Sequence, residues 1–313
     1  MTNEAVILTQ ALTKSYGDAQ AVRSLNLSVG RNRITAFLGR NGAGKSTTIK
    51  MLLGMIRPTA GSGFVLGKQI TNVAENRELR QRVAYVAEDK PLYGYMTVEQ
   101  TIRFASSFYP DWRKDVEKKL LRDYELPLRR RVKMLSKGMR TKLALLLAFA
   151  RRPDLLILDE PSEGLDPVGI EYLLQLLVAQ AAEGASVFFS SHQIAEVERV
   201  ADQVCILEKG CLLVDASLDQ LRQFYRRIDL VFSSLPPERE FRISGVQRIQ
   251  TSGHRISVFA SRNADAVIER AHDLNVVSVE VAPVGLRDVF LETVKENGTC
   301  FGTKRGSRLD LDF

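Results

Sequence analysis

A glycine-rich segment near the N-terminus constrains the fold of this chain more than any other stretch. The run Ile34-Thr-Ala-Phe-Leu38 is typical of a strand, and Ser46 to Leu53 has the character of a helix. The segment that joins them reads Gly39-Arg40-Asn41-Gly42-Ala43-Gly44-Lys45-Ser46-Thr47. Its glycines let backbone N–H groups close around phosphates, while Lys45 supplies a positive charge and Ser46 a hydroxyl for Mg²⁺. A strand, a loop and a helix in this order predict a nucleotide phosphate site.

Beyond this loop, short apolar runs alternate with helical patterns. We expect strands at 155–159, 186–190 and 203–207 and helices at 137–151, 168–182 and 193–200. This alternation predicts an α/β fold with a mainly parallel core sheet covered by helices. Strands at 5–8 and 21–29 are expected to form an antiparallel N-terminal part.

The pattern also predicts a division into domains. Helices at 99–109 and 113–124 belong to a helical subdomain at about 97–150, inside a first domain of residues 1–222. Residues 223–296 are predicted to form a small α+β domain. Its expected elements are strands at 228–232, 241–249, 255–259 and 276–281 and helices at 264–274 and 285–296. Residues 297–313 are expected to be a flexible tail.

Charge and hydropathy limit the partners of the chain. The net charge of +7 over 313 residues suits an anionic partner, but the basic run Arg129-Arg-Arg131 also fits a solvated surface. Aromatic residues do not interleave with that run, and we expect no nucleic acid partner. The N-terminus lacks the pattern of a signal peptide, so secretion is not expected. The wholly apolar run from Leu143 to Ala150 is too short for the roughly 20 residues that cross a bilayer.

Two carboxylates follow the apolar run Leu155 to Leu158, where a buried parallel strand would emerge beside the phosphate loop. Asp159 is placed to hold Mg²⁺ through its water shell. Glu160 is placed to orient and polarise a water that attacks a γ-phosphate. The alternative is an exposed acidic pair that only ends a strand.

The segment Leu135-Ser136-Lys137-Gly138-Met139 precedes the predicted helix 137–151. Ser136 can cap this helix, and Gly138 permits close backbone approach, so the helix start offers a second anion site. A serine in this place can equally be an ordinary helix cap.

The order of these motifs resembles the ATP-binding subunit of ABC transporters, most of all that of bacterial ABC-2-type exporters. The resemblance runs through about residues 5–222. Leu135 to Met139 matches the signature segment of the family, and Pro161-Ser-Glu-Gly-Leu-Asp166 matches the loop that crosses between paired subunits. His192 matches the switch histidine, and Tyr16 matches the aromatic residue that stacks on adenine.

The resemblance assigns further roles that the residues alone leave open. Glu160, His192 and Lys45 become catalytic. Tyr16, Glu88, Ser136, Gly138 and Asp166 join the phosphate loop in holding ATP, and Ser46, Asp159 and Glu88 become the magnesium ligands. Without the resemblance, Tyr16 would fit a position in the hydrophobic core. His192 would then fit a structural histidine whose ring is hydrogen-bonded.

The sequence departs from the family pattern at a few site positions. Glu88 stands where the family often has Gln, which brings a negative charge near Mg²⁺. Lys137 and Met139 stand where Gly and Gln are common, and Glu163 replaces a small residue in the crossing loop. Because Lys45, Asp159, Glu160 and His192 are retained, we expect hydrolysis of ATP to persist.

The resemblance implies a head-to-tail pair of subunits, a homodimer or a related heterodimer, in which each ATP lies between the phosphate loop of one and the signature helix of the other. It also implies a membrane-spanning permease and a place in the cytoplasm at the inner face of the cell membrane. The segment Lys90 to Met96 is a candidate docking surface or an ordinary buried loop. The alternative function is a soluble ABC ATPase with a non-transport or regulatory role.

Overall fold

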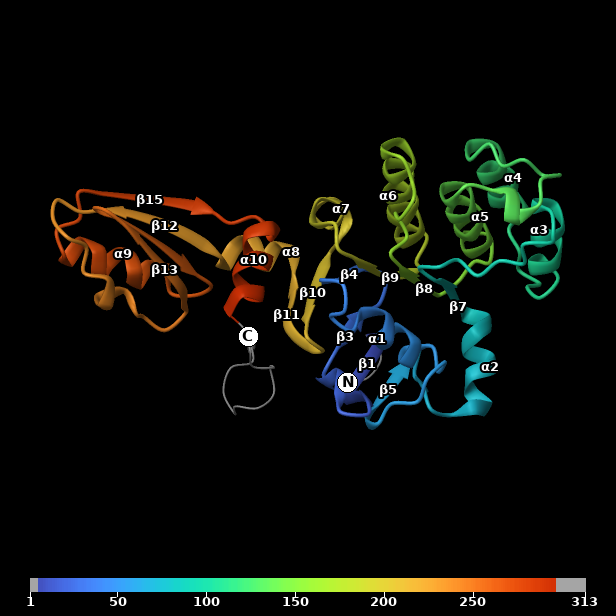
Figure 1. The fold of residues 1–313 in the computed structure, drawn as a ribbon, viewed down its shortest axis with the longest axis horizontal. Coiled ribbons are helices and arrows are strands. Elements are labelled where there is room, and N and C mark those ends of the chain that lie inside the picture. The colour runs from blue at the N-terminus through green and yellow to red at the C-terminus, as the bar shows by residue number, and fades with distance from the viewer. Residues whose placement is uncertain (1–4, 297–313) are drawn as a thin grey trace. The chain divides into compact units, whose positions relative to one another are not determined.

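The computed structural model describes residues 5–296, which form two compact units, one ending at Asp215 and one beginning at Ala216 (Figure 1). The predicted tail at 297–313 lies outside the described residues. The division falls earlier than the sequence boundary after residue 222, because the helix Leu218–Phe224 (α8) packs against the last helix, Leu286–Glu296 (α10).

The first unit contains a six-stranded sheet in the order β11-β10-β4-β9-β8-β7. Its strands are Cys211–Ser217 (β11), Gln203–Glu208 (β10), Ile34–Gly39 (β4), Ser186–Ser191 (β9), Leu155–Asp159 (β8) and Val83–Val86 (β7). The pairs β10-β4, β4-β9, β9-β8 and β8-β7 are parallel. Parallel strands end at the same edge of a sheet, so the segments after β4, β8 and β9 are brought close together. The expectation of a mainly parallel core sheet is confirmed.

A second, antiparallel sheet holds the N-terminus in the order β2-β1-β5-β6, with β3 paired to β1. Its strands are Ala5–Tyr16 (β1), Ala19–Leu25 (β2), Ser28–Gly30 (β3), Ala60–Val65 (β5) and Lys68–Gln69 (β6). The single strand predicted at 21–29 is wrong, because the chain breaks between β2 and β3. Ser24 adopts a positive φ of 44°, and Asn26 Oδ1 accepts a hydrogen bond from the Ala11 N–H at 2.8 Å.

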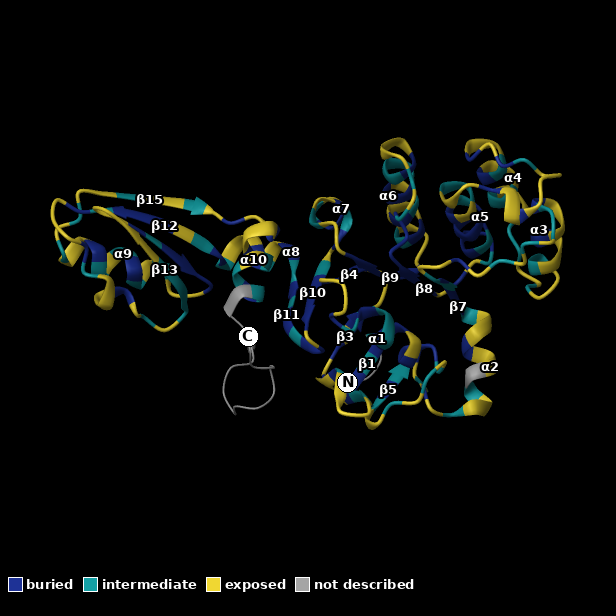
Figure 2. Ribbon diagram, in the orientation of Figure 1, coloured by how far each residue is buried: buried dark blue, intermediate teal, exposed yellow. Residues whose placement is uncertain are grey.

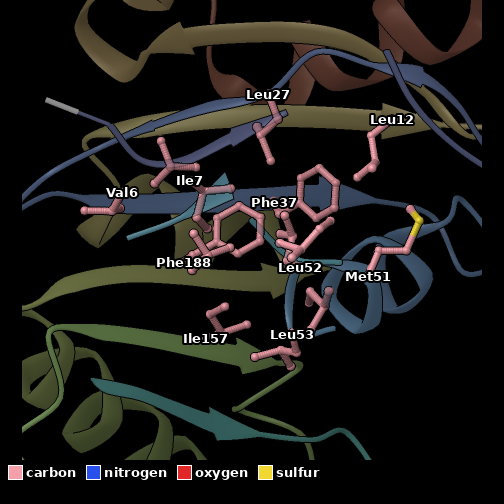
Figure 3. Packing of buried hydrophobic residues seen from close by; sticks show 14 of the residues in the cluster. Val6, Ile7, Leu12, Leu27, Phe37, Met51, Leu52, Leu53, Ile157 and Phe188 are labelled. Carbon is pink, nitrogen blue, oxygen red and sulfur yellow. The ribbon is translucent and has the colours of Figure 1, made fainter. Parts of the chain in front are cut away.

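One apolar cluster joins the two sheets and the helix Lys45–Leu52 (α1) (Figure 3). Phe37 of β4 and Phe188 of β9 pack at 5.3 Å between ring centroids, with Leu52 of α1 and Ile7 of β1 beside them. The strands β4, β8 and β9 are buried along their whole length, as Figure 2 shows in dark blue. This burial fixes the strand ends from which the site residues project.

Helices complete the first unit (Figure 1). They are Val73–Arg82 (α2), Val98–Ser106 (α3), Lys114–Asp123 (α4), Lys137–Phe149 (α5), Pro167–Ala182 (α6) and Ile194–Val200 (α7), with a 3₁₀ turn at Val132–Met134 (η1). α3 and α4 both pack on α5, as expected for a helical subdomain. Among residues 5–296, no helix has the length and apolar character needed to cross a membrane.

The second unit is an antiparallel sheet with helices, in the strand order β13-β14-β12-β15. Its remaining elements are Arg226–Val231 (β12), Glu238–Phe241 (η2), Val246–Ser252 (β13), Arg255–Ala260 (β14), Ala264–Asp273 (α9) and Ser278–Pro283 (β15). The strand predicted at 241–249 begins later. Phe241 ends a 3₁₀ turn and is fully buried against Phe232, and Gly245 has a φ of 92° that interrupts any strand.

We predict that Phe188→Ala lowers the free energy of unfolding of the first unit by about 3–5 kcal/mol, because it leaves a cavity in the shared core. The chain has one tryptophan, Trp112 in this unit, so its fluorescence during urea unfolding measures the change. Phe108→Ala, at an exposed ring, is the matched control and should cost less than about 1 kcal/mol. Equal losses for the two variants would contradict this account of the core.

Candidate functional site

The phosphate loop connects β4 directly to α1, as the sequence predicts. Gly42 and Gly44 have φ values of 80° and 108°, a region that favours glycine. A Cβ on Gly44 would lie 2.3 Å from the Ala21 carbonyl oxygen of β2, so any side chain there is excluded. α1 begins at Lys45 with no side-chain cap, and its first N–H groups therefore suit an anion.

The remaining loop residues differ in exposure. Arg40, Asn41 and Gly42 are exposed, Ala43 is buried, and Ser46 and Thr47 are half-buried in the first turn of α1. Together with His192, Glu208 and Lys209, the first four line a cavity of about 510 Å³.

Two side chains, one at the start of α1 and one just after β9, converge on a buried carboxylate at the end of β8. Lys45 Nζ lies 3.2 Å from Glu160 Oε1, and His192 Nδ1 lies 2.9 Å from Glu160 Oε2. Lys45 also donates to the Gly39 carbonyl at 2.8 Å. Glu160 is 6% exposed, and its Oε1 accepts no hydrogen bond from the described residues despite the nearby ammonium. The structure thus brings together the three residues expected to be catalytic.

The backbone of Glu160 is held in an unusual conformation. Its φ is 47°, which is strained for a residue with a side chain. The Glu160 N–H donates to Ser190 Oγ at 3.0 Å, and the Ser190 hydroxyl donates to Asp159 Oδ1 at 2.6 Å. Ser190 on β9 therefore fixes both carboxylates at the end of β8.

A second set of donors holds the Glu160 carbonyl. Lys90 Nζ donates to it at 3.3 Å and to the Glu88 carbonyl at 2.8 Å, and the Glu163 N–H donates to the same Glu160 oxygen at 3.2 Å. Burial lowers the pKa of the Lys90 ammonium, and the charge of Glu163 raises it in part.

The side-chain oxygens expected to hold Mg²⁺ come from three residues. Asp159 is buried at the end of β8, Ser46 is half-buried, and Glu88 is exposed after β7. Burial raises the pKa of Tyr85, and the charges of Asp159, Asp89 and Glu88 raise it further, so this edge is electronegative. In residues 5–296, no three His, Cys, Asp or Glu side chains form a metal cage. A few hard oxygens beside a phosphate loop fit Mg²⁺, which keeps waters and takes phosphate oxygens.

The signature segment faces the crossing loop (Pro161–Asp166) of its own chain. Ser136 caps α5, and its Oγ accepts from the Met139 N–H at 3.2 Å. A Cβ on Gly138 would lie 2.5 Å from the Gly164 carbonyl oxygen. In the described part of the chain, no hydrogen bond or ion pair joins Ser136 or Gly138 to the phosphate loop of the same chain.

Lys137 and Glu163, two charged departures from the family pattern, contact each other. Lys137 Nζ forms an ion pair with Glu163 Oε1, and Thr141 Oγ1 donates to the Glu163 carbonyl at 3.0 Å. The hydrogen bond from Lys137 lowers the pKa of the Glu163 carboxyl. The two unusual charges therefore neutralise each other and tie the crossing loop to the start of α5.

Two further predicted residues stand apart from the Glu160 cluster. Asp166 caps α6, and its Oδ1 accepts from the Gly169 N–H at 2.6 Å. Tyr16 ends β1 and is 53% exposed, so the reading of Tyr16 as a core residue is wrong. Lys14 Nζ lies 5.0 Å from the centre of its ring.

Sequence reasoning missed several residues of the site. Ser190 and Lys90 hold Glu160, yet neither belongs to a pattern with a specific chemistry. Glu208 ends β10 beside the phosphate loop, is buried, and has an Oε2 that accepts no hydrogen bond from the described residues. Burial raises the pKa of Glu196 on α7, a bond from Ser162 lowers it, and the Glu160 charge raises it. Ser190 and Glu208 each follow an apolar run, and no comparable signal in the sequence marks Lys90 or Glu196.

Comparisons of this chain with known proteins all indicate one family. The model of the family described as ABC transporter matches residues 22–163. The chain is 35% identical to the bacitracin transport ATP-binding protein of Bacillus licheniformis, over 71% of this chain and 73% of that protein. It is 32% identical to Nod factor export ATP-binding protein I of Bradyrhizobium diazoefficiens, over 93% of this chain and 96% of that protein.

A solved structure agrees with this result. The ATP-binding subunit of an ABC transporter matches with a TM-score of 0.64 and 32% identity, over 70% of this chain and 92% of that chain.

We predict that Gly138→Ala destabilises the first unit, because the added Cβ would meet the Gly164 carbonyl oxygen of the crossing loop. A cost of about 1–3 kcal/mol is expected from overpacking. Urea unfolding followed by Trp112 fluorescence measures it. A stabilised variant, gaining the up to about 1 kcal/mol that Ala has over Gly in a helix, would contradict the close approach.

Proposed function

The chain belongs to the family of ABC transporter ATP-binding proteins, and on this premise we propose that it is the motor subunit of a transporter with a separate membrane-spanning permease. The chain is an ATPase of this type. The observation that carries the proposal is the convergence of Lys45 and His192 on the buried Glu160 carboxylate. A lysine that binds phosphate beside a carboxylate that can orient and polarise water is a recurring combination in phosphoryl-transfer sites, where catalysis is mainly positioning and charge stabilisation.

Each of these residues has a proposed task. The phosphates of ATP attract Lys45 Nζ, whose hold on Glu160 is an ion pair and not a hydrogen bond. Glu160 Oε1 then accepts a proton from the attacking water. His192 keeps Glu160 oriented through Oε2 and is sufficiently exposed to reach a γ-phosphate oxygen.

Mg²⁺ is the proposed metal cofactor, held by Ser46 and Asp159 with Glu88 nearby. When bound, the ion neutralises charge on the β and γ phosphates. Asp159 suits this task because, among the described residues, Ser190 donates only to its Oδ1. The other carboxylate oxygen therefore stays available for the metal and its waters. Glu88 adds a charge to the same electronegative edge.

The complete ATP site is proposed to need a second subunit, a copy of this chain or a related one. The signature helix, α5, is capped by Ser136. The Ser136 side chain accepts from one N–H of the first turn, which leaves other N–H groups of that turn to bind an anion. Within one chain this helix start contacts the crossing loop, and no hydrogen bond or ion pair among residues 5–296 joins it to the phosphate loop. A two-fold pair would supply each phosphate loop with the partner's signature segment.

The permease is proposed to dock on an aromatic surface beside β7. Four exposed rings, Tyr93, Tyr95, Phe104 and Phe108, contact one another in series at 5.1–5.8 Å between centroids. Exposed aromatic clusters of this kind are typical of protein interfaces. Tyr93 and Tyr95 lie in the segment that begins at Lys90, Phe104 lies on α3, and Phe108 follows the end of α3.

Export is the proposed direction, because the relatives include a protein named for bacitracin transport and one named for Nod factor export. The proposed location is the cytoplasm, at the inner face of the cell membrane and on the permease.

The boundary between the two domains is proposed to lie after Asp215, with the second unit as an accessory domain.

We predict that Glu160→Gln retains ATP binding and stalls hydrolysis, because an amide cannot accept the water proton. Turnover should fall by about 100-fold or more. Glu269→Gln, at an exposed carboxylate on α9, is the control and should keep full turnover. A phosphate-release assay measures both.

The same variant should trap the paired state with ATP, which size-exclusion chromatography detects as a dimer. A Glu160→Gln protein that remains monomeric with saturating ATP, alone and with a related subunit added, would contradict the composite site.

We predict that Lys45→Ala abolishes nucleotide binding, because the phosphates lose their cation. Lys50→Ala, an exposed lysine on the same helix, should bind normally. Filter binding with labelled ATP measures the affinity, and thermal unfolding checks that both variants fold. Tight ATP binding by a folded Lys45→Ala protein would refute the assignment of the phosphate loop.

A further inference from the structure

Lys90 is a buried lysine that no part of the proposed chemistry uses. It is 6% exposed, and its backbone has a positive φ of 45°. Lysine is rarely buried unless its ammonium is paired. Here the ammonium donates to two backbone carbonyls, those of Glu88 and Glu160.

The contact at Glu160 reaches the backbone of the residue that is proposed to activate water. Glu160 has the strained φ of 47°, and its carbonyl accepts from both Lys90 Nζ and the Glu163 N–H. Strained backbone persists only where surrounding bonds hold it. Lys90 is the charged donor of the two, and a charged donor generally forms a stronger hydrogen bond than a neutral one.

The contact at Glu88 connects Lys90 with the strand end of β7. The Lys90 N–H donates to the Ala87 carbonyl at 3.3 Å, and the Lys90 carbonyl accepts from the Leu92 N–H at 2.8 Å. These bonds make a tight turn of residues 87–92. The turn leads directly to Tyr93, the first ring of the aromatic surface.

We propose that Lys90 is a positioning residue that holds the strained backbone of Glu160, and through it the carboxylate, in the geometry needed for hydrolysis. This inference rests on the proposed function, in which Glu160 activates water. The Lys90 ammonium holds the Glu160 carbonyl from the 87–92 turn, and the Glu163 N–H holds the same oxygen from the crossing loop. Loss of this ammonium would let the Glu160 backbone relax and displace its carboxylate from the attacking water.

This arrangement affects the rate of hydrolysis and not the affinity for ATP. Lys90 contacts no residue of the phosphate loop by any hydrogen bond of the described residues. A displacement of catalytic groups by about 1 Å can cost up to about 100-fold in rate. Loss of Lys90 should therefore lower kcat and leave the nucleotide Kd nearly unchanged.

The test uses Lys90→Met in the full chain, because methionine fills a similar volume without an ammonium. Lys90→Arg retains the charge and donors, and Lys118→Met removes an exposed lysine of α4 as the matched control. We expect Lys90→Met to lower kcat by about 10-fold with less than about 2-fold change in Kd, Lys90→Arg to recover part of the loss, and Lys118→Met to match the unaltered chain.

A second measurement does not depend on turnover. Hydrogen–deuterium exchange of the segment 159–164 reports the N–H groups of Glu160 and Glu163, which are bonded around the Glu160 backbone. Lys90→Met should raise exchange there by about 3-fold or more and leave α9 unchanged. Unchanged exchange in this segment, or a kcat equal to that of Lys118→Met, would overturn the proposal.

The outcomes separate this inference from the function on which it rests. If Glu160→Gln stops hydrolysis and Lys90→Met does not slow it, only the role of Lys90 fails. If Glu160→Gln hydrolyses ATP normally, the proposed function fails, whatever Lys90→Met does. In the Glu160→Gln background, Lys90→Met should cause no further loss, whereas a purely structural role would give additive losses.

Discussion

The ion pair between Lys45 and Glu160 is the interaction on which the rest of the site depends. It joins the start of α1 to the end of β8, with 3.2 Å between Nζ and Oε1 and both side chains buried. Removing one partner of a buried pair typically costs about 3–5 kcal/mol, because the other charge is left uncompensated. The phosphates of ATP can replace Glu160 as the counter-ion of Lys45. In our proposal, this exchange frees the carboxylate at the moment when the substrate arrives.

The parallel sheet makes this pair possible, and neighbouring groups define its geometry. β4, β8 and β9 end at one edge, so Lys45, Glu160 and His192 meet although they are far apart in the sequence. Ser190 holds the Glu160 N–H and Lys90 holds its carbonyl. On the other side of Glu160, the crossing loop is clamped to α5 through Gly138 and the Lys137–Glu163 pair. The site is therefore connected both to the signature helix and to the aromatic surface.

The sequence predicted the parts of the site that depend on local pattern. The phosphate loop, the acidic strand end at Asp159 and Glu160, and the Ser136 cap each follow from residue types at fixed spacing, and the structure places them as expected. It did not predict Lys90 or Ser190, because their roles arise from contacts across the sheet and the turn after β7. The polar helix α2 and the glycine-containing strand β5 were also missed, since neither carries a clear apolar period. The departures at Lys137 and Glu163 looked independent in the sequence and are one ion pair in three dimensions.

The claim that ATP is shared between two chains can be measured most directly by mixing two inactive variants. One carries Lys45→Ala and the other Ser136→Arg, so each homodimer has two defective sites. A mixed pair regains one intact site, formed by the phosphate loop of the Ser136→Arg chain and the signature segment of the Lys45→Ala chain. Our account predicts that the equimolar mixture recovers ATP hydrolysis, up to about a quarter of the unaltered rate if the two sites act independently. A mixture that stays as inactive as its components, although the two chains pair, would contradict it.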